Sequence, residues 1–217
     1  MAGTLVVFAS RQEFSALFPK VSAVVASSTP VFVPPALEVG VCGVGLTEFS
    51  ANLSRFLSQK KYERAFLLGI CGAYPESGLQ LGDVVRVESE VVADMGVQDR
   101  QGHFVPWSQV SGKESIYKGG DVRDLPLPLV AFPMVSGASV NCCTGTQYLA
   151  SRRSSLFNVQ VESMEGAAFF AACKAFGVSA YQYRAVSNIA TDRDESSWKI
   201  NEALAALKIQ VLDQLTQ

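Results

Sequence analysis

Residues 65–70, with the sequence AFLLGI, form an uninterrupted apolar run that ends at Cys71, Gly72 and Ala73. A strand that is apolar at every position is suited to burial on both faces, and such strands occur in parallel sheets covered by helices on both sides. The run therefore predicts a central strand of an α/β domain.

Strand and helix patterns alternate along most of the remaining chain. Strands are predicted at residues 4–9, 37–42, 83–92, 131–135 and 180–186, with a short one leading into Val161, and helices at about 11–18, 46–59, 147–155, 164–176 and 198–215. Residues 93–128 are rich in Gly, Pro, Asp and Gln, and we expect no regular structure there. The alternation predicts a single domain over residues 1–217, with a mostly parallel sheet wrapped by helices.

Composition narrows the class of partner. The 217 residues are 48% hydrophobic and 18% charged, which is enough for one sizeable core. The net charge is −2 and the basic residues are scattered, so nucleic acid and anionic membranes are poor partners and a small molecule is expected. No stretch approaches 18 consecutive apolar residues, and the first residues lack a signal pattern, so we expect a cytoplasmic protein.

Cysteine and histidine usage argues against a metal site. The five cysteines include no CxxC pair, and we expect reduced, buried thiols. His103 is the only histidine, and we expect it in a surface loop. A zinc site or a histidine-based catalytic triad would have to depend on that one residue. The cysteines are Cys42, Cys71, Cys142, Cys143 and Cys173.

A dinucleotide cofactor is also not supported. Gly43 and Gly45 follow a predicted strand, but Glu48 occupies the position of the third glycine in a dinucleotide-binding loop. No phosphate-binding loop motif occurs elsewhere in the chain.

Polar residues follow several predicted strands. In open parallel sheets, ligands bind beyond the carboxyl ends of the strands. A carboxylate there can accept two hydroxyl hydrogens, as the cis-diol of ribose requires, and a second carboxylate can orient and deprotonate a water. Each residue alone also has a structural explanation, such as a helix-start acid, an ion-pair partner or a turn residue. Their shared placement favours a site for a hydroxylated ligand; the residues are Glu13, Asn141, Glu165, Arg184 and Asn188.

Two motifs carry a family resemblance. VESMEGAA at residues 161–168, followed by RAVSN at 184–188, resembles the purine nucleosidase and nucleoside phosphorylase family, which includes methylthioadenosine/S-adenosylhomocysteine nucleosidases. Ser163, the Ser-Asn pair at 187–188, VNCCTG at 140–145 and DRDESSW at 192–198 are similar to the futalosine hydrolase branch. The resemblance is weakest across residues 93–130. It implies a three-layer sandwich with a central, mostly parallel mixed sheet flanked by helices.

The resemblance implies catalytic roles for four residues. Glu13 would activate the attacking water, and Glu165 would bind the ribose hydroxyls. Arg184 would help to hold the nucleophile or Glu13, and Asn188 would face the purine. No metal or organic cofactor is implied.

The same resemblance implies the substrate pocket. Ile70 stands where adenine-specific relatives carry a serine, so the water would have one fewer hydroxyl partner. The role of Glu162 stays open between pocket and structure, and Met164 and Trp198 also fit plain core packing. The implied pocket residues are Ile70, Gly72, Val140, Asn141, Met164 and Trp198.

The activity implied by the resemblance is hydrolysis of the N-glycosidic bond of futalosine, a 5′-modified inosine-type nucleoside, which would release hypoxanthine in menaquinone biosynthesis. The alternatives are a methylthioadenosine/S-adenosylhomocysteine nucleosidase, a purine nucleoside phosphorylase, and a nucleoside-binding protein without activity. A carboxylate at Glu13 would repel phosphate, whereas Arg11 and Arg184 would attract it. A homodimer is also implied, in which residues 93–130 would contribute to the neighbouring pocket.

Overall fold

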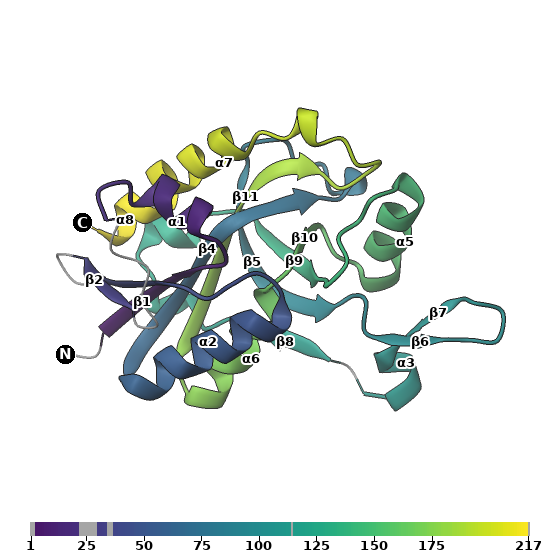
Figure 1. Ribbon diagram of the computed structural model, residues 1–217, viewed down its shortest axis with the longest axis horizontal. Coiled ribbons are helices and arrows are strands. Elements are labelled where there is room, and N and C mark those ends of the chain that lie inside the picture. The colour runs from purple at the N-terminus through teal and green to yellow at the C-terminus, as the bar shows by residue number, and fades with distance from the viewer. Residues whose placement is uncertain (1–2, 22–29, 34–36, 114, 217) are drawn as a thin grey trace.

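The computed structural model describes residues 3–21, 30–33, 37–113 and 115–216, with the backbone alone at residue 124. It forms three layers, a mixed sheet between two groups of helices (Figure 1). The main sheet runs in the spatial order β10 (Val161–Ser163), β9 (Met134–Ser139), β5 (Val84–Val92), β11 (Ser179–Ile189), β4 (Tyr62–Ala73), β1 (Gly3–Phe8), β3 (Leu37–Val41) and β2 (Val31–Val33), and β8 (Ile116–Lys118) pairs with β5. The predicted fold class is confirmed.

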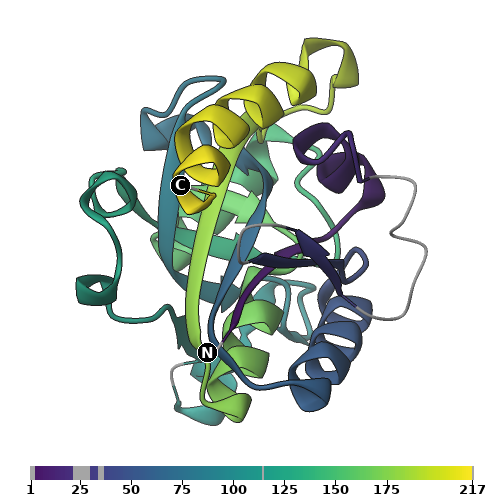
Figure 2. The same ribbon diagram turned by 90° about the vertical axis from the view of Figure 1, so that its left-hand side faces the viewer.

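Helices cover both faces of the sheet. Figures 1 and 2 show one group of helices on each side of the central strands. One side has α1 (Arg11–Leu17), α7 (Ile200–Leu207), a π-helical turn (Lys208–Leu212) and α8 (Asp213–Leu215); the other has α2 (Leu46–Gln59) and α6 (Gly166–Phe176). The remaining long helix, α5 (Gln147–Phe157), packs near β9 and β10.

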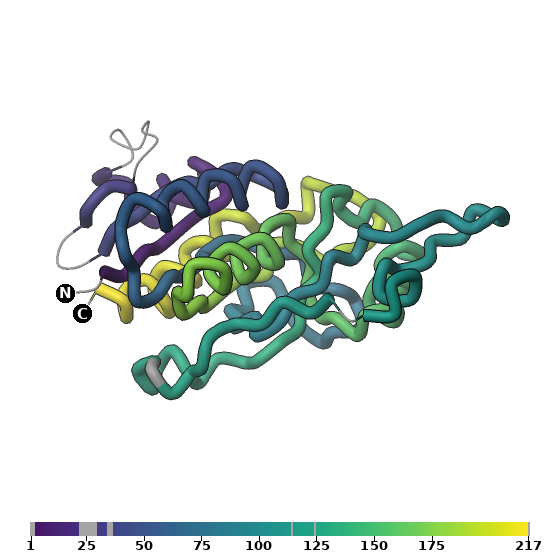
Figure 3. The backbone as a smooth tube through the Cα atoms, turned by 90° about the horizontal axis from the view of Figure 1, so that it is seen from below, coloured from purple at the N-terminus to yellow at the C-terminus, as the bar shows by residue number. Residues whose placement is uncertain are grey.

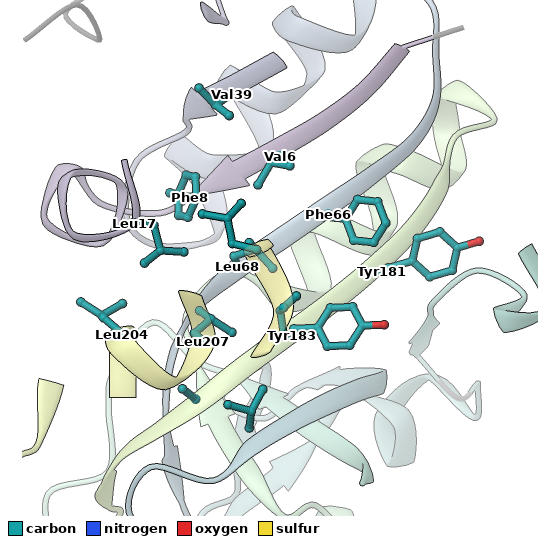
Figure 4. Close-up of a cluster of buried hydrophobic side chains, with 14 of the residues drawn as sticks. Val6, Phe8, Leu17, Val39, Phe66, Leu68, Tyr181, Tyr183, Leu204 and Leu207 are labelled. Carbon is teal, nitrogen blue, oxygen red and sulfur yellow. The ribbon is translucent and has the colours of Figure 1, made fainter. Parts of the chain in front are cut away.

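Strand β4 separates two apolar cores, as the apolar run at residues 65–70 predicts. Phe66 and Leu68 point into the core beneath α1 and α7 (Figure 4). Ala65 and Leu67 point into the core beneath α2 and α6. All four side chains are fully buried, so this strand is covered on both faces.

The sheet closes on itself at the carboxyl end of β4. There β10 pairs antiparallel with β4, and Glu162 lies opposite Gly72. On its other side β10 pairs parallel with β9, and β4 also pairs parallel with β11, where Asn188 lies opposite the same Gly72. The closure brings together the ends of three strands that are far apart in the sequence.

The prediction of no regular structure over residues 93–128 is wrong. The segment contains a hairpin that projects from the body of the molecule (Figures 1 and 3). Its elements are each only three to five residues long, too short for a periodic pattern to mark them. They are β6 (Gly96–Gln98), β7 (Phe104–Pro106), α3 (Trp107–Ser111), β8 and a 3-10 turn (Val122–Asp124), with α4 (Leu127–Val130) at the end.

Other expectations are settled by burial. His103 is exposed in the β6–β7 hairpin, as predicted, beside Asp99. The expectation of buried thiols holds for Cys42, Cys71 and Cys173 but is wrong for Cys142 and Cys143, which are exposed. Within the described ranges, no helix has the length and apolar character needed to cross a membrane.

Candidate active site

A cavity of about 220 Å³ opens where the ends of β4, β10 and β11 meet the start of α1. Most of the predicted site residues line it, although they come from five separate parts of the sequence. Those residues are Glu13, Ile70, Gly72, Met164, Glu165, Arg184, Asn188 and Trp198.

Two predicted residues lie outside the lining. Val140 is fully buried in an apolar cluster, where its backbone N–H donates to the carbonyl of Ser163. Asn141 is exposed, and its backbone N–H donates to Asp94 Oδ2 at 2.5 Å. The part of this loop that reaches the cavity is Cys143, which has no functional role in the sequence analysis.

Glu13 is fixed by the start of its own helix. Ser10 caps α1 by accepting from the backbone N–H of Glu13, and Glu13 Oε2 accepts from both the backbone N–H and the hydroxyl of Ser10, at 2.9 and 3.0 Å. Oε1 accepts from the backbone N–H of Ile70 at 3.0 Å. Each carboxylate oxygen has two acceptor positions, so Oε1 keeps one of its two for a ligand.

Gly69 allows Glu13 and Arg184 to approach the same stretch of β4. A Cβ atom at this position would lie 2.5 Å from Glu13 Oε1 and 2.6 Å from an Arg184 guanidinium nitrogen. Both groups are buried, at 6% and 1% exposure, and could not easily move away. Any side chain at residue 69 would therefore displace the site.

Arg184 pairs with Glu165. One guanidinium nitrogen donates to Glu165 Oε2 at 3.3 Å, and another donates to the carbonyl of Ile70 at 3.2 Å. Burial raises the pKa of Glu165, and the charge of Arg184 and the backbone N–H of Gly45 act against that shift. The arginine thus holds the carboxylate that was expected to bind ribose, rather than Glu13.

The loop between β3 and α2 supplies the second contact to Glu165. The backbone N–H of Gly45 donates to Glu165 Oε1 at 3.2 Å, and Val44 lines the cavity. Gly45 has φ +87°, a conformation that only glycine adopts readily. In the sequence, Gly43 and Gly45 indicate at most a cofactor loop, and no motif there marks the contact of Gly45 with Glu165.

Asn188 is oriented by the preceding serine. The Ser187 hydroxyl donates to Asn188 Oδ1 at 2.9 Å, and it also lies 3.2 Å from the carbonyl of Cys71. The shorter contact fixes the orientation of the Asn188 amide. Among the described residues, the amide nitrogen then has one long contact of 3.5 Å, to the carbonyl of Ile189. This amide nitrogen is therefore a donor without a strong protein partner.

Glu162 belongs to a different cluster although it also reaches the cavity wall. Its Oε1 accepts from the backbone N–H of Thr144 at 2.7 Å. Its Oε2 accepts from Tyr74 at 2.8 Å, from Arg153 at 3.0 Å and from the Thr144 hydroxyl at 2.5 Å. The carboxylate is thus held by the protein itself.

The family of the chain follows from a direct match. A model of the phosphorylase superfamily matches residues 22–214. The chain belongs to the phosphorylase superfamily. It is 32% identical over 174 residues to the futalosine hydrolase of Thermus thermophilus, which covers 76% of this chain and 75% of the relative.

Other members of the superfamily are also similar. The futalosine hydrolase of Streptomyces coelicolor is 30% identical over 190 residues, which covers 81% of this chain and 77% of the relative. The structure of a futalosine hydrolase mutant of Helicobacter pylori superposes with a TM-score of 0.78 over 99% of both chains, at 14% identity. That likeness concerns the fold.

The cavity of this superfamily member is acidic. Three glutamates and one arginine line it within the described part of the chain, namely Glu13, Glu162, Glu165 and Arg184. The arginine is already paired. In the same described part, no group of three or more His, Cys, Asp or Glu side chains could hold a metal ion.

Proposed function

We propose that the protein is an N-ribosyl hydrolase that cleaves futalosine and releases hypoxanthine. The observation that carries the proposal is the pair of buried carboxylates, Glu13 and Glu165, on one cavity beside Arg184. The identity of 30–32% to two futalosine hydrolases supports the substrate.

Glu165 would act on the ribose. Breaking the N-glycosidic bond builds positive charge on the ribosyl carbon and ring oxygen, and an anionic carboxylate beside the sugar stabilises that charge. Among the described residues, Glu165 accepts from two donors, Gly45 and Arg184, so it keeps acceptor positions for ribose hydroxyls. Met164 lines the cavity beside it and offers an apolar surface to the sugar.

Glu13 would bind and activate the attacking water. The capping contacts fix Oε2, and the Ile70 N–H directs the remaining acceptor position of Oε1. A water that donates there can transfer a proton to the carboxylate as it attacks the sugar. The buried backbone contacts hold the base in place before the substrate arrives.

Asn188 would stabilise the departing purine. Its amide nitrogen can donate toward N7 and the 6-oxo oxygen of hypoxanthine. Trp198 also lines the cavity and carries the Arg193 guanidinium over its ring, 5.0 Å from the centroid. We assign the indole to the purine end of the cavity, since aromatic rings and purines stack.

Phosphate is a weaker candidate than water as the nucleophile. Three carboxylates and one paired arginine face the cavity in the described structure, and this balance disfavours a dianion. Arg11 is exposed and is not part of the lining.

The decisive experiment is chromatography of the products formed from futalosine, inosine and methylthioadenosine, with and without phosphate. We expect free hypoxanthine from futalosine at the same rate with or without phosphate. Ribose 1-phosphate products would identify a phosphorylase, and preferred release of adenine would identify the alternative nucleosidase. Tight binding of all three nucleosides without cleavage would identify a binding protein.

We also assign the protein a homodimer, a cytoplasmic location and a step in menaquinone biosynthesis. Residues 95–116, which include the projecting hairpin, expose large apolar side chains at 36–45% of their area. Burial against a second copy would remove these side chains from water. These residues are Met95, Val97, Trp107, Val110 and Ile116. Free thiols at all five cysteines suit a reducing compartment. Light scattering of the parent and of Trp107→Asp tests the dimer, and a monomeric parent would refute it.

A further inference from the structure

Glu90 is a carboxyl group buried behind the active site, in β5. It is 1% exposed and does not line the cavity. Gln182 Nε2 donates to its Oε1, and the Ser139 hydroxyl donates to its Oε2, both at 2.9 Å. Neither the proposed mechanism nor the sequence analysis gives this residue a role.

The contact with Ser139 leads to Glu165. The Ser139 oxygen that donates to Glu90 also accepts from the backbone N–H of Ala167 at 2.8 Å. Ala167 lies in the first turn of α6, two residues after Glu165. The carboxyl group of Glu90 is therefore two hydrogen bonds away from the backbone that carries Glu165.

The contact with Gln182 leads to Arg184. Gln182 and Arg184 are alternate residues of β11, and alternate residues of a strand project from the same face. Gln182 is completely buried, so its amide is fixed between Glu90 and the strand. Glu90 thus contacts a residue near each partner of the Glu165–Arg184 pair.

Two glycines make room for the carboxyl group. A Cβ atom on Gly166 would lie 2.0 Å from Glu90 Oε1, and one on Gly137 would lie 2.5 Å from it. The first residue of α6 and the centre of β9 are therefore packed directly onto this carboxyl group. Only residues without a side chain fit at both positions.

We propose that Glu90 is a positioning residue of the active site, which ties the first turn of α6, through Ser139, to β11, through Gln182, and so holds Glu165 and Arg184 against each other. The inference rests on the proposed hydrolase function. It adds a fourth glutamate to the site without contact to the substrate.

The surroundings favour a neutral carboxyl group. Burial raises the pKa of Glu90 to about 7, against the hydrogen bonds of Gln182 and Ser139 and the charge of Arg184, while Glu165 adds to the rise. Gln182 Oε1 has no partner in the described structure and would lie 2.7 Å from a Cβ on Gly166, the same point that Glu90 Oε1 approaches. A neutral Glu90 carboxyl group would offer a donor to this acceptor, which an ionised one could not.

The charged and titratable groups facing Glu90 are few. Among the described residues they are Arg184 from β11, Glu165 ahead of α6, the thiol of Cys71 in β4, and Tyr117, which lies opposite Glu90 in β8. The facing residues of β9, Gly137 and Ser139, carry no charge. When Glu90 ionises, a second anion competes with Glu165 for Arg184, so we expect turnover to fall as the pH rises through about 7.

Glu90→Gln separates the charge from the ties. With the Gln182 amide turned over, a carboxamide at residue 90 can donate to Gln182 Oε1 and accept from Ser139, so it keeps both ties without a charge at every pH. We expect its kcat on futalosine to stay within about threefold of the parent at pH 6. Between pH 6 and pH 8.5 the parent should lose about tenfold, as about one neutral group titrates, and the variant should not.

Ser139→Ala separates the tie from the charge. It keeps the carboxyl group but removes the link to Ala167, and we expect kcat at pH 6 to fall about tenfold. The alkaline limb of the pH profile should move to higher pH, because Ser139 lowers the pKa of Glu90. Glu88→Gln, in the same strand but exposed, is the matched control and should behave like the parent.

The outcomes separate this inference from the function on which it rests. A parent that releases no base from any nucleoside refutes the proposed hydrolase and this role with it. An active parent refutes the role of Glu90 alone if Glu90→Gln keeps the alkaline loss, or if Ser139→Ala has the kcat and pH profile of the parent. The role is supported if Glu90→Gln keeps kcat at pH 6 and loses the alkaline limb, while Ser139→Ala loses kcat at pH 6 and has its limb at higher pH, since general loss of packing would not produce these two patterns.

Discussion

The molecule has two buried arginine–glutamate pairs, and their glutamates stand on either side of Met164 in the sequence. Arg153 contacts Glu162 at 3.0 Å, and Arg184 contacts Glu165 at 3.3 Å. All four charged side chains are at most 8% exposed. Burial and charge pairing therefore do not distinguish the two pairs.

The difference lies in the remaining hydrogen bonds. Glu162 accepts four contacts, all of 3.0 Å or less, from Thr144, Tyr74 and Arg153. Glu165 accepts two, at 3.2 and 3.3 Å, and Arg184 Nε has no partner among the described residues.

Within the described structure the protein makes three contacts to Glu162 Oε2 and one to Oε1, which leaves this pair little to offer a ligand. A pair with open acceptor and donor positions costs desolvation energy in the free protein. A hydroxylated ligand can recover that energy by filling those positions. Unfilled hydrogen-bonding capacity at a cavity, rather than charge alone, marks the functional pair. We call Glu165 and Arg184 the open pair, and Glu162 and Arg153 the closed pair.

The largest effect should come from Glu13, which lines the same cavity as Glu165 and Arg184. Glu13→Gln keeps the shape of the side chain but removes the base, so kcat on futalosine should fall about 100-fold or more. The Kd of the intact nucleoside, measured by calorimetry, should change little. Equal turnover in the two proteins would exclude Glu13 from the chemistry.

Glu165→Gln should have the next largest effect. Loss of the anion beside the ribosyl carbon lowers kcat, and loss of an acceptor for the ribose hydroxyls raises KM, so kcat/KM should fall about 30-fold or more. Kinetics with a ribo substrate and its 2′-deoxy analogue test the assignment. If the variant keeps the preference of the parent between them, Glu165 does not bind the diol.

The sequence could identify the open pair because its signal is local. Glu165 and Arg184 lie in the two short motifs, residues 161–168 and 184–188, that carry the family resemblance. The same reasoning placed Asn141 in the pocket. In the structure Asn141 is exposed outside the cavity lining, and its backbone N–H donates to Asp94.

The closed pair could not be predicted in the same way. Glu162 is satisfied by side chains between 9 and 88 residues away, and no spacing rule connects them. Glu90 was missed for a similar reason, since its partners come from β9 and β11. The long buried strands were predictable from composition, whereas the hairpin at residues 96–106 depends on strands too short to show a period.

Asn188 gives a smaller but more specific effect. Asn188→Asp removes the donor that faces a 6-oxo purine and supplies a group suited to a 6-amino purine, so the ratio of kcat/KM for the two bases should shift about 10- to 100-fold toward the 6-amino nucleoside. Kinetics of the parent and the variant on futalosine and its 6-amino analogue, at one pH, measure the ratio. An unchanged ratio would mean that Asn188 does not read the base.

The smallest effect on catalysis should come from the closed pair, with the cost appearing in stability instead. In Glu162→Gln the new amide group replaces an oxygen that accepts from Tyr74, Arg153 and the Thr144 hydroxyl. A buried arginine without its counter-charge typically costs about 3–5 kcal/mol, so the free energy of unfolding in urea should fall by about that amount. Below the unfolding transition, kcat/KM should stay within about threefold of the parent.

Glu63→Gln, an exposed change in β4, is the control for both measurements. A folded Glu162→Gln protein with kcat/KM reduced more than tenfold would give the closed pair a share in the chemistry, and the distinction between the two pairs would fail.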